Sequence, residues 1–194
     1  KPDLFIASSI MIIKEEEFHN NDFFGDQYKF EIINLGNGPA KHVEIRWAND
    51  LESRFSKLNS IHFKENPIDI SFKSYLNFNF NNVAFFFNNH DKKEVNKINY
   101  VLNGGEKNRF FFIGQNLMRY IIFESLIYAN HHHSKEIGLY HIDKNNNSKL
   151  EVEYRDTLGY KKMIAFKINI KSTIYKKADF SVESIMFNFD FESI

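Results

Sequence analysis

The 194-residue sequence contains no cysteine and only three prolines. The absence of cysteine excludes disulfide bonds, thiol catalysis and cysteine-ligated zinc, and it leaves the redox environment of the protein undetermined. No apolar run approaches the roughly 20 residues that a helix needs to span a bilayer. Neither charge is in excess, because 25 Lys and Arg balance 25 Asp and Glu. Without an overall positive field, we expect no double-stranded DNA partner.

Several nucleotide-binding and catalytic motifs are also missing. The sequence has no GxxxxGK[ST] phosphate loop, no GxSxG nucleophile elbow and no HExxH zinc motif. Paired carboxylates do occur, as in Asp190 and Glu192, but any chain of this composition contains such pairs. We therefore expect a protein that binds rather than catalyses, with no catalytic residue and no cofactor.

The composition that remains is that of an ordinary globular protein, with 43% hydrophobic and 26% charged residues. The length suits one β-rich domain over residues 1–194. The chain starts with Lys1 instead of methionine and has no signal segment, so we expect that further sequence preceded Lys1. We expect membrane contact only through that preceding segment.

Alternation of apolar and polar residues and short apolar runs predict many β-strands. The predicted strands cover residues 4–13, 27–34, 41–47, 68–72, 76–80, 83–87, 98–102, 109–113, 150–154, 162–170 and 180–191. Turn-forming residues occur at 34–40, 103–106 and 156–159, and the last two segments predict hairpins. Together these features predict a mainly β fold, an immunoglobulin-like antiparallel β-sandwich or a barrel-like variant.

Two segments interrupt the β pattern and predict short inserted helices. Asp50 can cap a helix in which apolar residues recur at intervals of three and four over 51–61. The segment 115–128 fits a helical face, although 120–123 also fits a strand, and we predict a short helix there. The most loop-like stretch is 130–148.

This loop-like stretch contains the residues that suggest metal binding. The three consecutive histidines at 131–133, followed by His141 and Asp143, are possible ligands for zinc or nickel. Adjacent residues of a regular element cannot all point at one ion, so we interpret the stretch as a solvated loop and predict no metal site. An EF-hand calcium loop is excluded because Ser148 and Tyr154 stand where Gly and a bidentate Glu are needed.

The arginines give the clearest indication of a ligand, because lysine cannot replace a planar bidentate donor. Arg109 begins a predicted strand and Arg155 precedes the turn at 156–159. If Arg109, Arg119 and Arg155 converge, they form a site for a phosphate or carboxylate. Tyr154 would then offer an aromatic surface for a base. The alternative is a set of scattered surface salt bridges.

Three turn motifs occur in a fixed order along the chain: Asn34-x-Gly36-x-Gly38-Pro39-Ala40-x-x-Val43, Gly104-Gly105-Glu106 and Tyr154-x-Asp156-x-x-Gly159-Tyr160. Over roughly two-thirds of the chain, this order resembles that of bacterial β-sandwich domains that follow an N-terminal membrane anchor. The chain is also similar to the β-strand-rich sensor domain of two-transmembrane antiphage effectors. In that family a cytoplasmic β domain senses a cyclic nucleotide and controls membrane damage by the anchor. The resemblance implies the cytoplasmic face of the bacterial inner membrane, and no binding residue is carried over from it.

We therefore expect a non-enzymatic ligand-sensing domain that reads an anionic small molecule such as a cyclic nucleotide. The first alternative is a protein-interaction or self-association module that uses a sheet edge or the loop 130–148. The second is a metal-dependent hydrolase built on the histidines. An arginine-lined pocket would favour the sensor, an exposed apolar edge would favour the interaction module, and converging histidines would favour the hydrolase.

Overall fold

The computed structural model describes residues 2–18, 26–48, 53–55, 58, 75–80, 83–88, 93–102, 109–141 and 149–194. The protein is mainly β. Neighbouring strands pair antiparallel in every described ladder. The predicted fold class, a mainly β antiparallel sandwich or barrel-like variant with inserted helices, is confirmed.

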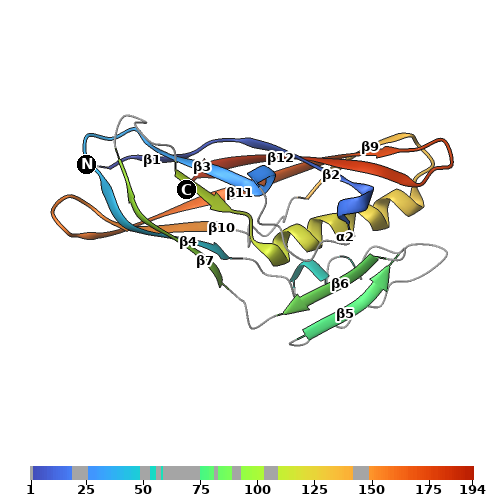
Figure 1. The fold of residues 1–194 in the computed structure, drawn as a ribbon, viewed down its shortest axis with the longest axis horizontal. Coiled ribbons are helices and arrows are strands. Elements are labelled where there is room, and N and C mark those ends of the chain that lie inside the picture. Colours follow the sequence, from blue (N-terminus) through green and yellow to red (C-terminus); the bar gives the residue numbers. More distant parts are fainter. Residues whose placement is uncertain are drawn as a thin grey trace.

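One layer of the molecule is a long, curled seven-stranded sheet (Figure 1). Its strands follow the order β2–β12–β11–β10–β4–β7, and β9 pairs with the second half of β11. The strands are β2 (Ser9–Lys14), β4 (Ala40–Ala48), β7 (Lys93–Val101), β9 (Glu136–Tyr140), β10 (Lys149–Arg155), β11 (Lys161–Lys176) and β12 (Val182–Ser193). The hairpin predicted around 156–159 is confirmed by the pairing of β10 with β11.

The second layer consists of a three-stranded sheet and a helix. The sheet has the order β1–β3–β8, with β1 (Leu4–Ile6), β3 (Lys29–Asn34) and β8 (Arg109–Phe112). Helix α2 (Gln115–His131) follows β8, and a separate hairpin of β5 (Tyr75–Phe80) and β6 (Val83–Asn88) lies on its far side (Figure 1). Two short 3-10 helices, η1 (Glu15–Glu17) and η2 (Asp26–Tyr28), are also described, and residues 53–55 and 58, within the helix predicted over 51–61, are helical.

Aromatic side chains from both sheets form the centre of the sandwich. The ring of Phe30 on β3 lies 5.6 Å from that of Trp47 on β4 and 5.1 Å from those of Phe189 and Phe191 on β12. Tilted and edge-to-face contacts at this distance are favourable for aromatic pairs. Buried residues alternate with half-buried ones along β3 and most of β4, which places these rings inside, as the sequence pattern predicts.

Helix α2 is buried on nearly all sides, with twelve buried residues in seventeen. It packs against β11 and β12 on one side and against β6 on the other. On the β6 side, Phe55 contacts both Phe87 and Tyr120, at centroid distances of 5.0 and 5.3 Å. A helix that is apolar all round has a weak amphipathic pattern. This explains why the sequence of α2 fits a strand almost as well as the predicted helix.

The C-terminal end of α2 is held by a buried lysine. The ammonium group of Lys176 on β11 donates hydrogen bonds to the carbonyl oxygens of Ala129 and His132. A cation at this position satisfies carbonyls that have no partner within the helix and complements the helix dipole. Burial lowers the pKa of Lys176.

The turn motif at 34–40 is organised by Asn34. Its Nδ2 donates to the carbonyl oxygens of Gly38 and Val101, at 2.7 and 3.2 Å, and its Oδ1 accepts from the backbone N–H groups of Asp3 and Gly36. The buried side chain therefore joins the start of the chain, the turn and β7. The role of the turn motif at 34–40 in this structure is therefore to stabilise the fold.

Three predictions about connections are wrong. Strands β7 and β8 do not form a hairpin, because β7 pairs with β4 in the large sheet and β8 pairs with β3 in the small one. The single opening strand predicted at 4–13 is divided at residues 7 and 8 between the two sheets. The loop-like stretch 130–148 contains β9, which pairs with β11. In each case, local turn and strand signals do not specify which sheet receives the strand.

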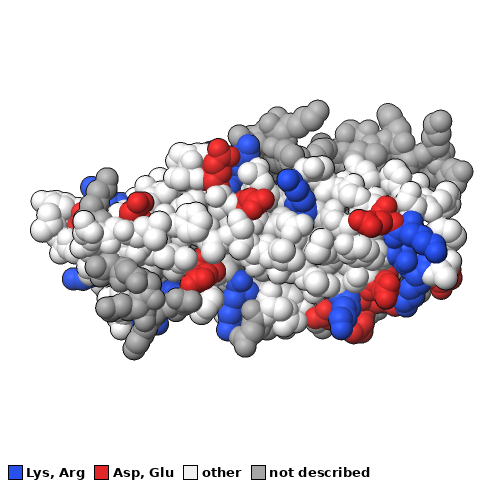
Figure 2. Space-filling model, turned by 90° about the horizontal axis from the view of Figure 1, so that it is seen from above, with Lys and Arg blue, Asp and Glu red and all other residues white. Residues whose placement is uncertain are grey.

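Several predicted features lie outside the described residues, namely the strand 68–72, the Gly104-Gly105-Glu106 turn, Asp50, and the segment from Asp143 to Ser148. No helix in the described part of the chain is long and apolar enough to cross a membrane. Charges of both signs alternate over the face shown in Figure 2, as the overall charge balance suggests.

Candidate functional site

A pocket of about 570 Å³ lies where β7 of the large sheet meets β3 and β8 of the small sheet. This volume falls in the range of small-molecule sites. Its described lining combines three cations with three aromatic rings and includes no carboxylate. The lining residues are Lys29, Lys97, Ile98, Asn99, Tyr100, Arg109, Phe110 and Phe112. We call it the seam pocket.

The seam pocket exists because β7 and β8 lie side by side without forming a ladder. The side chain of Asn96 on β7 bridges the gap, accepting from the N–H of Phe112 at 3.1 Å and donating to its carbonyl at 3.3 Å. The indole N–H of Trp47 donates to the same carbonyl at 2.9 Å. The backbone of Phe112 is thus fixed against the large sheet, while the residues that precede it on β8 border the pocket.

Arg109 is the most distinctive side chain of the seam pocket. Its guanidinium carbon lies 5.0 Å from the ring centroid of Tyr100, a cation–π contact. Its Nε is buried and has no hydrogen-bond partner among the described residues. An unpaired buried donor costs about 1–3 kcal/mol, and such departures from complete pairing concentrate at functional sites.

Lys29 and Lys97 place two further positive charges at the seam pocket. The ammonium of Lys29 lies 5.4 Å from the ring centroid of Phe112, its cross-strand neighbour. Lys97 lies at the outer rim, 3.8 Å from a carboxylate oxygen of Glu44. Glu44 also forms an ion pair with Arg46, so the negative charge of Glu44 is shared between two cations. The described part of the pocket lining is therefore positive in a molecule whose total charge is zero.

An ion-pair network lies beside the seam pocket on the outer face of the large sheet. Glu153 accepts from Lys161 at 2.8 Å and from Arg46 at 3.1 Å, and Arg46 also pairs with Glu44. The hydrogen bond from Lys161, together with that from Arg46, lowers the pKa of Glu153 against the opposing effect of burial. Hydrogen bonding to Glu153 raises the pKa of Arg46. Glu44 and Glu153 are therefore each paired with two cations.

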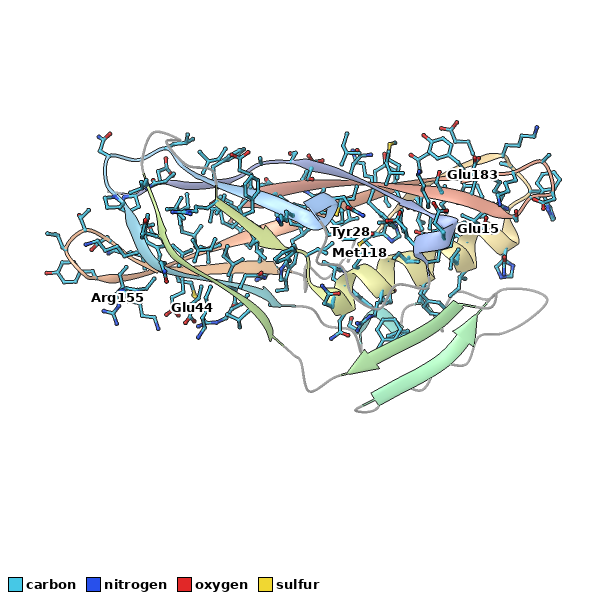
Figure 3. The ribbon with its side chains drawn as sticks, in the orientation of Figure 1. Glu15, Tyr28, Glu44, Met118, Arg155 and Glu183 are labelled. Carbon is cyan, nitrogen blue, oxygen red and sulfur yellow. The ribbon has the colours of Figure 1, made fainter. Side chains whose placement is uncertain are left out.

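The predicted ligand residues do not converge. Of the four, Arg109 is the one that lines the seam pocket. Arg119 lies on α2, and Arg155 lies at the end of the β10–β11 hairpin, far from the first turns of α2 marked by Met118 (Figure 3). Arg155 donates to the carbonyl of Gly159 at 3.2 Å. Tyr154 points the other way, into the core, because neighbouring residues of a strand face opposite sides. Burial raises the pKa of Tyr154.

Sequence reasoning missed the remaining cations and rings of the seam pocket. Lys29 and Lys97 are two of many lysines, and Phe110 and Phe112 lie on a predicted strand where aromatic residues are normally core. These residues come from three strands that are distant in the sequence. Arg109 was the one residue of the described pocket lining that the sequence singled out, because arginine is rare in this chain.

A second polar cluster, buried beneath α2, involves His141. Its Nδ1 lies 2.5 Å from Glu124 Oε2 and its Nε2 lies 2.8 Å from Ser172 Oγ, with Ser125 Oγ at 3.4 Å. With an ionised carboxylate, Nδ1–H donates to Glu124 and Nε2 accepts from the Ser172 hydroxyl. This is the order of groups in an acid–histidine–serine hydrolase. Ser172 is only 2% exposed, so no substrate reaches its Oγ unless α2 moves.

The cluster instead joins three elements, since Glu124 and Ser125 lie on α2, His141 follows β9 and Ser172 lies on β11. The histidines at 131–133 are exposed to solvent and do not belong to this cluster. Among the described residues, no group of three or more His, Asp or Glu side chains is placed to hold a metal ion. His141 belongs to the buried cluster and not to the solvated loop predicted for it.

Comparison with known proteins gives no match to a protein-family model, to a curated protein or to a solved structure. We therefore infer function from the geometry of the seam pocket.

Proposed function

We propose that the protein is a non-enzymatic ligand-sensing domain that binds an anionic small molecule, with a cyclic nucleotide as the first candidate, in the seam pocket. The observation that carries this proposal is the unpaired guanidinium nitrogen of Arg109. Its buried Nε has no partner among the described residues, although two lysines and three aromatic rings surround it. A phosphate oxygen would supply the missing acceptor and would be the natural counterion for three cations.

Each side of the seam pocket has a role in this proposal. Arg109 binds the phosphate through its planar fork, and Lys29 and Lys97 add charge. Phe110, whose side chain is among the exposed large hydrophobics at 51%, offers a free face on which a base stacks. Base stacking on aromatic side chains is worth about 1–3 kcal/mol.

The wider context of the proposal comes from the sequence resemblance alone. On that basis we include an N-terminal membrane anchor and a location at the cytoplasmic face of the bacterial inner membrane. Ligand binding would then control an effector activity of the anchor.

A protein-interaction module is the alternative, and one observation favours it. Strand β2 ends the described path of the large sheet and exposes Ile10 and Ile12 on its outer face. An uncovered apolar edge is a common site of strand addition.

Thermal unfolding with a panel of cyclic mono-, di- and oligonucleotides distinguishes these proposals. A ligand that binds only the folded protein stabilises it by about 2.7 kcal/mol at 100 times its dissociation constant. We expect a shift in melting temperature with one nucleotide class, its loss in Arg109→Ala, and its weakening with added salt.

Arg155→Ala is the matched control, because it removes an arginine outside the seam pocket and should leave the shift intact. Phe110→Ala should abolish the shift with nucleotides but not with inorganic pyrophosphate, which has no base to stack. No shift with any anion, or equal losses in Arg109→Ala and Arg155→Ala, would overturn the proposal and leave the interaction module.

A further inference from the structure

The β10–β11 hairpin turn and the β3–β4 turn lie together at one end of the elongated molecule (Figure 1). The two turns touch, since a side-chain atom placed on Gly38 would meet Thr157. The start of the described chain is there too, because the N–H of Leu35 donates to the carbonyl of Asp3 at 2.7 Å. We call this end the hairpin end.

Large apolar side chains project into solvent at the hairpin end. Leu158 is 79% exposed, Leu35 is 66% exposed and Tyr160 is 63% exposed. The turn is nevertheless well formed, since Asp156 Oδ1 accepts from the N–H groups of Leu158 and Tyr160 at 3.0 and 2.9 Å. Leu158 and Tyr160 are therefore held in a hydrogen-bonded turn.

Cationic side chains flank these apolar groups. Lys162 lies 6.0 Å from the ring centroid of Tyr160, and Arg155 and Lys41 are cross-strand neighbours on the same exposed row of the sheet. Figure 2 shows the extremity of this end as mostly uncharged surface, with both basic and acidic side chains beside it. The carboxylate of Asp156 keeps its negative charge while it accepts the two hydrogen bonds of the turn, and the exposed Asp3 also lies at this end, but Lys41, Arg155 and Lys162 outnumber these two carboxylates.

From this arrangement we infer that the hairpin end docks on an anionic lipid surface. Leucine at the tip, tyrosine behind it and basic residues at the rim match the apolar interior, interfacial layer and charged headgroups of a bilayer. A protein partner fits less well, because a stable protein interface needs about 800 Å² on each side and a narrow hairpin tip presents a few side chains. This contact is separate from the seam pocket and from any anchor preceding Lys1.

Flotation of the intact chain with lipid vesicles tests the inference. We expect binding to vesicles of equal parts phosphatidylcholine and phosphatidylglycerol, and at least tenfold weaker binding to phosphatidylcholine alone. Leu158→Ser combined with Tyr160→Ser should reduce binding to anionic vesicles at least tenfold. Arg155→Glu should reduce it too, and added salt should weaken binding by the native chain.

Ile10→Ser is the matched control, because Ile10 is 65% exposed and lies on β2, away from the hairpin end. A second measurement uses Leu158→Trp, whose emission should shift to the blue on anionic vesicles while the buried Trp47 and an Ile10→Trp variant show no change.

Three outcomes would overturn the inference: no binding to anionic vesicles, equal loss in Ile10→Ser and in the hairpin variant, or an unshifted Leu158→Trp spectrum. Concentration-dependent dimerisation that disappears in Leu158→Ser would also overturn it and would identify a second copy of this chain as the partner.

Discussion

A Cβ atom on Gly38 would lie 2.8 Å from Cγ2 of Thr157, closer than two nonbonded carbons approach. Gly38 does not have a left-handed backbone, unlike Gly159 with its φ of 86°. Space, and not backbone conformation, therefore requires glycine at position 38. The contact also brings together two of the turn motifs recognised in the sequence, namely the β3–β4 turn, which crosses between the two sheets, and the β10–β11 turn of the large sheet.

We expect Gly38→Ala to destabilise the fold by about 1–2 kcal/mol, because the β-branched Thr157 side chain must move or the turns must separate. In a Thr157→Ser background, where Cγ2 is absent, the same substitution should instead stabilise by about 0.4–1 kcal/mol by restricting the unfolded chain. Urea unfolding of the four proteins of this cycle measures the sign change. Equal effects of Gly38→Ala in both backgrounds would show that Thr157 is not the cause.

The His141 cluster predicts a large loss of stability from small changes to buried polar atoms. Glu124→Ala leaves a buried imidazole N–H without its acceptor and should cost about 2 kcal/mol or more, while Ser172→Ala should cost about 1 kcal/mol because Ser125 Oγ lies within reach. Chemical denaturation provides both values. Ser193→Ala, at an exposed position of β12, serves as the control and should be neutral. Neutral behaviour of Glu124→Ala would mean that the cluster does not hold α2 on the sheet.

Much of the fold was predictable because alternation along a strand is a local signal. The alternation in β3, β4, β10 and β11 predicts their buried faces correctly, and the turn at 156–159 predicts a true hairpin. What failed was the assignment of strands to sheets, as with β7 and β8. Where no tight turn joins two strands, pairing partners are decided by packing between distant segments, and no local pattern specifies them.

The residues of the seam pocket could likewise not be grouped from the sequence alone. The rarity of arginine directed attention to Arg109, but its neighbours Lys29 and Tyr100 reach it through two different sheets. The burial of Tyr154 follows from the alternation that the sequence already displayed. The burial of His141 did not follow, because it depends on β9 pairing with β11 and on α2 covering the site.

The ion pairs of Glu153 predict a pH dependence of stability. Its pKa lies below the ordinary value of 4.5, first because of the hydrogen bond from Lys161 and then because of Arg46. The unfolded chain therefore binds this proton more readily, so the stabilising contribution is complete above the ordinary pKa and is lost as the pH falls through the lowered one. We expect Glu153→Gln to lower the melting temperature at pH 7 and to match the native protein well below pH 4.5.

Lys161→Met provides the control for this pH effect. Because Lys161 is the largest cause of the lowered pKa, the effect of Glu153→Gln on the melting temperature should shrink in the Lys161→Met background. A difference in melting temperature that is constant with pH would assign the effect to packing and not to charge.

Replacement of the half-buried Arg109 should not destabilise the ligand-free protein. Arg109→Met keeps the aliphatic contact with Tyr100 but removes a buried donor that no described residue satisfies, and removing such a group recovers part of a cost of about 1–3 kcal/mol. The lost cation–π contact offsets this by about 0.5–2 kcal/mol, so we expect unchanged or higher stability by urea unfolding. Arg46→Met, which breaks the pairs with Glu44 and Glu153, should be destabilising by comparison. If Arg109→Met unfolds the protein more easily than Arg46→Met does, Arg109 is a structural residue and its unpaired nitrogen is no sign of a ligand.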